Sequence, residues 1–413
     1  MLNRRVARTW VGVLTVLLSG LGPTFLLARP VSPGPQQTEV EVISNPKTPV
    51  PPPGQRKRLV FKDDLSIGEK EGDENYMFGS EMFFNTDEDG NFYVTDWDKK
   101  RILKYDADGK YVLTIGRKGQ GPGEFQNLSV ARFDKEGNIY ATDLASRRIS
   151  FFDRSGRYLR QILMPDVFED LYIGPKGGYV SSRTIPLESE TGMGFKIVDG
   201  FFNDKFELVT EFLAQTPAMK PPSGRDATAM ARFTAGILSG TAFRPAPRHV
   251  LAADGRIYFG YPEDFSIIVY SAEGHKTKII KRAYEPIKVK DKDKDYFAAT
   301  RAMPFLTRTG IPRSEGEIRD VLKFIEYPES KPAYLSLSLM ETGWLVVLVE
   351  IAGGEYSLFD LFDTGGRYIG QFKAEMIPEY DWFFFKNGKA YAVEADAEGY
   401  KFIKRYSVKV EDY

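Results

Sequence analysis

An internal repeat is the feature that most constrains the fold of this chain. Residues 87–111, DEDGNFYVTDWDKKRILKYDADGKY, align without a gap to residues 134–158, DKEGNIYATDLASRRISFFDRSGRY, and 11 of the 25 positions are identical. Each copy reads as four short strands rich in β-branched and aromatic residues, with Gly-containing tight turns inside each hairpin. Four antiparallel strands in a period of about 40–50 residues are typical of one blade of a β-propeller.

Weaker copies of the same pattern follow along the chain and set the number of blades. They cover residues 171–213, 249–283, 334–373 and 380–410, and the last copy has only three strands. Residues 58–67, RLVFKDDLSI, form a spare strand that would complete the last blade and close the ring, which removes two open sheet edges. We therefore expect an all-β fold, a six-bladed β-propeller with helical insertions on one face.

The second repeat resembles a known family. Residues 115–153 contain IGRKGQGPGEF, DKEGNIYATD and RRISFFDRSG, which together resemble an NHL-repeat unit of the kind found in bacterial exported six-bladed propellers. The resemblance is good over residues 79–153 and weak in the later blades. The Asn-His-Leu tripeptide that names the family is missing, since Lys99-Lys100-Arg101 and Ser146-Arg147-Arg148 stand in its place. The family includes amidating lyases, protein- and RNA-binding domains and sensors, so the resemblance implies a fold and no particular ligand.

The N-terminal segment indicates export. Residues 1–28 combine three early arginines with an apolar run, which predicts a signal peptide or, alternatively, an uncleaved N-terminal anchor and membrane tether. Residues 29–57 are rich in proline and are expected to be a linker without a core of their own. The propeller would then occupy residues 58–413 in the periplasm or outside the cell. Cysteine is absent from the chain, which excludes disulfides and thiolate catalysis.

Long insertions are expected on one face of the propeller only. The turns inside the hairpins are short, whereas two connections between blades are long, at residues 214–248 and 284–333. The sequence Ser314-Glu315-Gly316-Glu317 is a capping box that predicts a helix through Ile325, and residues 223–226 are expected to cap a second helix through Ile237. Because loops on a rigid scaffold commonly carry function, this face is the expected working face.

Basic residues gather in these insertions. Residues 214–248 hold five Lys or Arg and one acid, and residues 286–313 hold seven and three, although the whole chain has a net charge of −1. This asymmetry predicts an anionic partner, either a protein or an anionic glycan or envelope ligand, and no nucleic acid. The candidate ligand-binding residues are Arg117, Lys118, Arg132, Arg232, Arg244, Arg248, His249, Tyr261, Arg301, Arg308 and Trp382.

Catalytic signals are weak, so an enzyme is the less favoured hypothesis. The chain has two histidines, of which His275 is expected in an exposed turn and His249 at the channel mouth. Two histidines cannot supply the zinc site of the amidating lyases. The repeated Asp96 and Asp143 are interpreted as ion-pair partners of Arg101 and Arg148, with a calcium site as the alternative. We expect a monomeric, non-enzymatic binding or scaffolding propeller without a cofactor; the alternative is a channel-mouth hydrolase or lyase that depends on calcium.

Overall fold

The computed structural model describes residues 39–50, 57–79, 82–187, 194–217, 222, 224, 226–309, 314–379, 382–396 and 398–412. The signal peptide or anchor expected at residues 1–28 lies outside the described residues. Within these ranges, no helix has the length and apolar character needed to cross a membrane.

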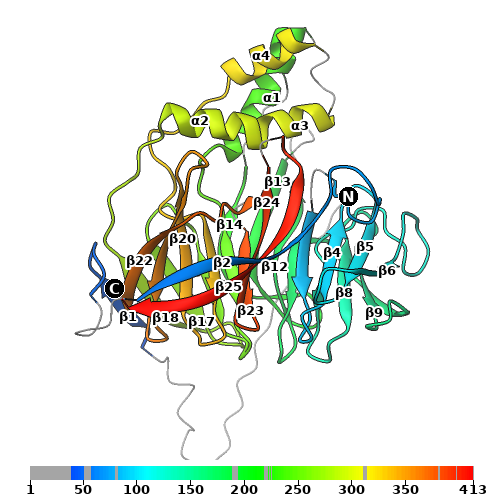
Figure 1. Ribbon diagram of the computed structural model, residues 1–413, viewed down its shortest axis with the longest axis horizontal. Helices are drawn as coiled ribbons and strands as arrows, with labels where there is room; N and C mark the ends of the chain where they lie inside the picture. Colours follow the sequence, from blue (N-terminus) through cyan, green and yellow to red (C-terminus); the bar gives the residue numbers. More distant parts are fainter. Residues whose placement is uncertain are drawn as a thin grey trace, which may run out of the picture. The chain divides into compact units, whose positions relative to one another are not determined.

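In the described part of the chain, five four-stranded sheets and one five-stranded sheet form the six blades of a propeller (Figure 1). The strands of blades 1 to 3 are β3 (Met82–Thr86), β4 (Phe92–Asp96), β5 (Arg101–Tyr105), β6 (Tyr111–Ile115), β7 (Arg132–Phe133), β8 (Ile139–Asp143), β9 (Arg148–Phe152), β10 (Tyr158–Leu163), β11 (Val167–Ile173), β12 (Tyr179–Leu187), β13 (Gly194–Phe202) and β14 (Leu208–Gln215). Those of blades 4 to 6 are β15 (Arg248–Leu251), β16 (Ile257–Gly260), β17 (Ser266–Tyr270), β18 (Lys276–Arg282), β19 (Ser336–Leu339), β20 (Leu345–Ile351), β21 (Ser357–Phe362), β22 (Tyr368–Ala374), β23 (Phe383–Lys386), β24 (Lys389–Ala395) and β25 (Lys401–Asp412). The expected six-bladed fold is confirmed.

The repeated Asp-x-x-Gly-Asn signature encodes the first hairpin turn of blades 1 and 2. The carboxylate Oδ1 of Asp87 accepts the backbone N–H groups of Asp89 at 3.0 Å and Asn91 at 2.9 Å. Gly90 has a φ of 81°, a conformation that favours glycine. Asp134 makes the same contacts in the next blade. The turn is therefore specified within five residues, which explains why the repeat was visible in the sequence.

The last blade closes the ring with a strand from the start of the domain. β2 (Lys57–Ile67) pairs antiparallel with β25 from Lys57 opposite Asp412 to Ile67 opposite Ile403. It brings Leu59 into the core between blades 5 and 6 and Ile67 into the core between blades 6 and 1. This is the pairing expected for residues 58–67.

Part of the expected linker is a strand, which corrects the prediction for residues 29–57. β1 (Glu41–Asn45) adds to the outer edge of blade 4 by pairing parallel with β18, from Glu41 opposite Lys278 to Asn45 opposite Arg282. The buried Asn45 amide donates to Lys281 O and Gly366 O, both at 3.0 Å. The open edge of β18 supplies hydrogen-bond partners that the proline content of the segment gave no reason to expect.

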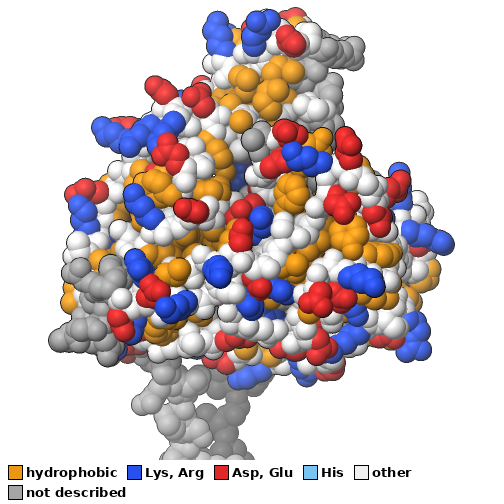
Figure 2. Space-filling model, in the orientation of Figure 1, with side chains coloured by type: hydrophobic (Ala, Val, Ile, Leu, Met, Phe, Trp, Pro, Cys, Tyr) orange, Lys and Arg blue, Asp and Glu red, His pale blue; other side chains and the backbone are white. Residues whose placement is uncertain are grey.

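The hydrophobic core is divided among the gaps between blades. Six clusters of buried side chains each join neighbouring blades around the ring, and a seventh lies inside the helical insertions. On the face that Figure 2 shows, acidic and basic side chains are mixed. Each blade is therefore stabilised mainly by its two neighbours, as in other repeat architectures.

The two long insertions form a helical cap on one face of the ring (Figure 1). The cap consists of α1 (Ala227–Thr241), α2 (Asp291–Phe297), the π-helical η1 (Ala298–Ala302), α3 (Met303–Thr309) and α4 (Glu315–Lys323). Asp226 caps α1 and Ser314 caps α4 through side-chain hydrogen bonds, as the sequence predicts. The continuous helical run from Asp291 to Thr309 was not predicted.

Candidate functional site: a cavity beneath the helical cap

The helical cap has a hydrophobic core of its own. Ala235 and Leu238 of α1 pack with Leu306 of α3 and Val321 of α4, and all four side chains are buried. α1 ends at Thr241, and Phe243, two residues later, has a φ of 53° in the left-handed region where glycine is usual. This turn directs residues 244–247 from the cap back toward blade 4.

A buried ion-pair network attaches the cap to blade 5. Lys331 Nζ lies 2.8 Å from Asp293 Oδ1 and 2.7 Å from Glu350 Oε1. Asp293 also accepts the backbone N–H of Lys290 and so caps α2. Lys331 and Asp293 are only 3% and 2% exposed, so breaking this network would leave buried charges without partners. The network therefore holds α2 at a defined position over the ring.

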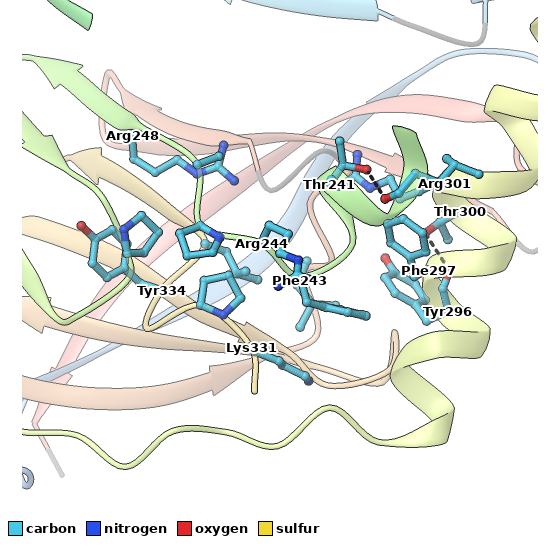
Figure 3. Close-up of a pocket in the computed structure, with 18 of the residues that line it drawn as sticks. Thr241, Phe243, Arg244, Arg248, Tyr296, Phe297, Thr300, Arg301, Lys331 and Tyr334 are labelled. Carbon is cyan, nitrogen blue, oxygen red and sulfur yellow. Dashed lines mark hydrogen bonds between the residues drawn. The ribbon is translucent and has the colours of Figure 1, made fainter. Parts of the chain in front are cut away.

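A cavity of about 470 Å³ lies between the cap and blades 4 and 5. Figure 3 shows Tyr296 to Arg301 of the cap on one side of it and Arg248 and Tyr334 on the other. Its lining consists of Leu238, Gly240, Thr241, Phe243, Arg244, Pro245, Ala246, Arg248, Pro262, Tyr296, Phe297, Thr300, Arg301, Pro304, Phe305, Lys331, Pro332, Tyr334, Leu335 and Ile351. This size is within the range of about 300–1,000 Å³ that is typical of small-molecule sites.

The charged groups of the cavity lining are all cations. Arg244, Arg248, Arg301 and Lys331 line it, and none of the Asp and Glu residues that the structure describes does. Lys331 is neutralised by the network described above, and Arg248 and Arg301 have other interactions within the fold. The exposed Arg244 bonds through Nε to Ser239 O at 3.4 Å, and no carboxylate of the described residues pairs with it. The cavity thus offers one exposed cation, Arg244, that has no carboxylate partner among the described residues.

Three of the four hydroxyl side chains of the lining donate to main-chain oxygens, and the fourth belongs to Tyr296. Thr241 Oγ1 donates to Leu238 O at 2.9 Å, Thr300 Oγ1 to Tyr296 O at 2.8 Å, and the Tyr334 hydroxyl to Ser266 O at 3.0 Å. Burial raises the pKa of Tyr334, which keeps its hydroxyl protonated. These three side chains therefore brace the cavity walls.

A second group of charged residues lies on the innermost strands of blades 2, 3 and 4. Arg132 of β7 pairs with Asp170 of β11, and its guanidinium lies 3.9 Å from the ring centre of Tyr172. His249 Nε2 of β15 lies 3.3 Å from Asp170 Oδ2. Asp170 has a φ of 48° and sits at a bulge in the pairing of β11 with β12. The bulge places its carboxylate between two neighbouring blades.

Arg132, Asp170 and His249 form what we call the channel group. Charge and burial act in opposite directions on the carboxyls of this group and of nearby Asp199. Burial opposes ionisation of Asp170, but the charges of Arg132 and His249 outweigh it and hold the pKa of Asp170 below its usual value. Burial raises the pKa of nearby Asp199, even though Ser182 donates a hydrogen bond to it. The two carboxyls therefore have pKa values displaced in opposite directions.

The structure places the residues predicted to bind a ligand at several separate positions. Arg244, Arg248 and Arg301 line the cavity, whereas Arg132 and His249 belong to the channel group. The others do not line the cavity. Arg117 pairs with Glu124 at 2.8 Å, Lys118 forms a β-bridge with Phe125, and the guanidinium of Arg232 lies 4.2 Å from the ring centre of Phe324. Tyr261 accepts a hydrogen bond from Gln215 at 3.0 Å, Trp382 packs on Phe84 and Phe384, and Arg308 belongs to α3, where its side chain is not described.

The repeated aspartates are structural in the described part of the chain. Asp96 lies 3.1 Å from Arg101, and Asp143 lies 3.7 Å from Arg148 and accepts the backbone N–H groups of Gln126 and Asn127. No group of three or more His, Asp or Glu among the described residues is arranged to hold a metal ion. His275 is exposed in a turn, as expected.

Sequence reasoning missed the apolar part of the cavity. Phe243, Phe297 and Phe305 line it together with Pro245, Pro262, Pro304 and Pro332. The only signal in the sequence was the density of proline and phenylalanine in the two insertions, because the lining residues come from distant segments.

Comparison with known proteins supports the fold. A family model described as a 6-bladed beta-propeller matches residues 86–211. No curated protein matches the chain. A candidate exported protein from Bacteroides fragilis is similar in structure, with a TM-score of 0.51, 13% identity and coverage of 90% of this chain and 99% of that one. The chain has the fold of a six-bladed β-propeller.

Two further solved structures are less similar. One is a protein from Bacteroides vulgatus, with a TM-score of 0.44, 12% identity and coverage of 87% of this chain and 100% of that one. The other is virginiamycin B lyase from Staphylococcus aureus, with a TM-score of 0.42, 10% identity and coverage of 84% and 99%. At these identities no function passes to this chain.

Proposed function

We propose that this propeller is an exported binding protein that takes an anionic group into the cavity beneath its helical cap. The observation that carries the proposal is the charge of the lining, in which Arg244 has no carboxylate partner among the described residues and no described Asp or Glu takes part. The proposal keeps the anionic partner expected from the sequence and replaces the broad insertion face with one cavity.

The physical chemistry of the cavity favours an anion over a neutral group. A concave site with apolar walls weakens the screening of charge by water, so a cation in it attracts an anion more strongly than on an open surface. An arginine can hold a carboxylate or phosphate through two parallel hydrogen bonds. Arg244 is exposed, so its side chain can reorient toward such a group.

Arg244→Ala tests the proposal by calorimetry with glucuronate, octanoate and inorganic phosphate as probes. At least one probe should bind the wild-type protein, and the variant should bind it about tenfold or more weakly, because a hydrogen bond to a charged group is lost. Raising salt from about 0.1 M to about 1 M should also weaken wild-type binding, because the screening length falls from about 10 Å to about 3 Å.

Arg319→Ala is the matched control, because Arg319 is an exposed arginine of α4 outside the cavity lining. It should bind like the wild-type protein, and both variants should melt normally, since exposed substitutions usually change stability by less than about 0.5 kcal/mol. If none of the three anions binds, or if both variants lose binding equally, the proposal is wrong.

The location outside the cytoplasm is part of the proposal. It is supported by the basic and apolar pattern of residues 1–28 and by the fold shared with the Bacteroides fragilis protein. Residues 115–153 resemble the NHL repeats of bacterial exported propellers, which is consistent with export. Membership of the NHL-repeat family remains a prediction. Mass spectrometry of the native chain should find a mature N-terminus near Arg29; an intact Met1 in a soluble cytoplasmic fraction would contradict export.

A second candidate function is the hydrolase or lyase activity at the channel. It is favoured by the channel group, where His249 and Asp170 lie 3.3 Å apart and Asp170 has a left-handed backbone. Residues in such conformations are common at active sites. Hydrolysis of an ester probe that His249→Gln abolishes, and Arg244→Ala leaves unchanged, would favour this candidate.

A further inference from the structure

The walls of the cavity are largely apolar, which indicates what the uncharged part of a ligand should be. Phe243, Phe297 and Phe305 present aromatic surface, and Leu335 and Ile351 present aliphatic surface from blade 5. Removing such surface from water is favourable in proportion to the area covered. A ligand that fills the cavity would therefore gain from an apolar body.

The cavity also has few hydrogen-bond donors for a neutral polar ligand. Four prolines line it, at positions 245, 262, 304 and 332, and proline has no backbone N–H. Three of the four lining hydroxyls, those of Thr241, Thr300 and Tyr334, already donate their protons to main-chain carbonyls. A sugar would bury several hydroxyl groups without partners, and each such group costs binding free energy.

Arg244 is the exposed cation among the four in the lining. Lys331 is buried and held by Asp293 and Glu350, so it is not available to a ligand. The charge of Arg244 has no carboxylate partner among the described residues, and Arg244 lies in the segment that joins the cap to blade 4. One anionic group, rather than several, matches this arrangement.

We infer that the ligand is a small amphipathic monoanion: one carboxylate or phosphate group on an aliphatic or aromatic body. The inference rests on the proposed function and narrows it, because the anionic partner is then neither a polymeric glycan nor an acidic protein surface. The head pairs with Arg244, and the body packs between the aromatic side chains of the cap and the apolar edge of blade 5.

A set of probes that differ in one property at a time tests the inference. Octanoate and octyl phosphate share an apolar body and an anionic head, octan-1-ol lacks the charge, and glucuronate lacks the apolar body. Calorimetry on the full chain should show one-to-one binding of octanoate, octyl phosphate or both. Octan-1-ol and glucuronate should bind about tenfold or more weakly, since each loses one of the two contributions.

Two variants separate the head from the body. Arg244→Ala should lower the affinity for octanoate to that for octan-1-ol, whereas Phe305→Ala should weaken both by a similar factor. Phe305 is only partly buried, so its truncation leaves most of the cap core in place. Arg319→Ala should change neither affinity. Comparison of octanoate with octyl phosphate identifies the preferred head.

The possible failures can be told apart. If glucuronate binds through Arg244 and octanoate does not, the inference is overturned while anion binding in the cavity stands. If octan-1-ol binds as tightly as octanoate, the anionic head is wrong. If no anion binds, the proposed function fails together with the inference.

Discussion

At the scale of single residues, Asp360 and Arg282 join blades 4 and 5 through a buried ion pair. Their side chains are 0% and 7% exposed, and Arg282 Nη1 lies 2.8 Å from Asp360 Oδ2. Tyr368 and Gln371 donate to the other carboxylate oxygen at 2.8 and 2.9 Å. The guanidinium lies between the rings of Phe265 and Tyr368. Because both groups are buried, each depends on the other as a charge partner.

Asp360→Asn replaces the carboxyl by a neutral amide that cannot titrate, so the variant lacks the pH-dependent stability that Asp360 contributes to the wild-type protein. Burial raises the pKa of Asp360 from 3.8 to about 6, although Arg282 opposes the shift. The folded protein therefore takes up this proton at a higher pH than the unfolded chain does. The carboxyl's contribution to stability is fully present below pH 3.8 and is lost as pH rises through about 6.

The free energy of unfolding of the wild-type protein, minus that of Asp360→Asn, should accordingly increase by about 1.4 kcal/mol for each unit that pH falls from about 6 toward 4. Urea unfolding of wild-type and variant proteins at a series of pH values measures this difference. If the difference in unfolding free energy stays constant from pH 8 to pH 5, Arg282 keeps Asp360 ionised, and burial does not determine the pKa of Asp360.

At the scale of elements, β1 shows how an edge strand is fastened from outside the repeat. Asn45 ends β1 and donates to Lys281 O in blade 4 and to Gly366 O in blade 5, while its Oδ1 accepts the N–H of Tyr368 at 2.8 Å. One buried amide thus bonds to three main-chain groups. We infer that β1 stabilises the junction between these blades as well as covering the edge of β18.

Asn45→Ala should lower the free energy of unfolding by about 1–3 kcal/mol, because it leaves buried main-chain groups without hydrogen-bond partners. Ser44→Ala is the control, since Ser44 is exposed and next in sequence, and it should change stability by less than about 0.5 kcal/mol. Equal effects of the two substitutions in chemical denaturation would show that β1 contributes only through its backbone.

At the scale of the whole propeller, stability depends on closure of the ring by β2. This strand supplies the outer edge of blade 6 and two side chains, Leu59 and Ile67, that are 2% and 3% exposed in two different inter-blade cores. Without it, β25 would become an open edge and both cores would lose part of their cover.

Deletion of residues 1–67 should therefore lower the thermal midpoint severely or abolish folding. Deletion of residues 1–38 is the control, because it retains both β1 and β2. Circular dichroism during heating measures both. Unchanged melting of the shorter chain would show that the ring does not need β2.

The sequence by itself determined the features whose causes are local. The turns at Asp87 and Asp134 are specified within five residues, and the caps at Asp226 and Ser314 act within the first turn of α1 and α4. The repeat then fixed the blade and the number of blades. Even the pairing of β2 was predictable, because a three-stranded last repeat needs a fourth strand.

Tertiary structure alone decided the rest, because the interactions join segments far apart in the chain. α2 is held by Lys331 and Glu350, and β1 by the edge of β18 more than 230 residues away, so neither has a strong local signal. The cavity collects Arg244, Arg301 and Tyr334 from three segments, whereas Arg132, equally basic in sequence, is neutralised by Asp170 in the channel. The number of charged residues can be read from the sequence, but the packing of distant segments determines which of them form ion pairs.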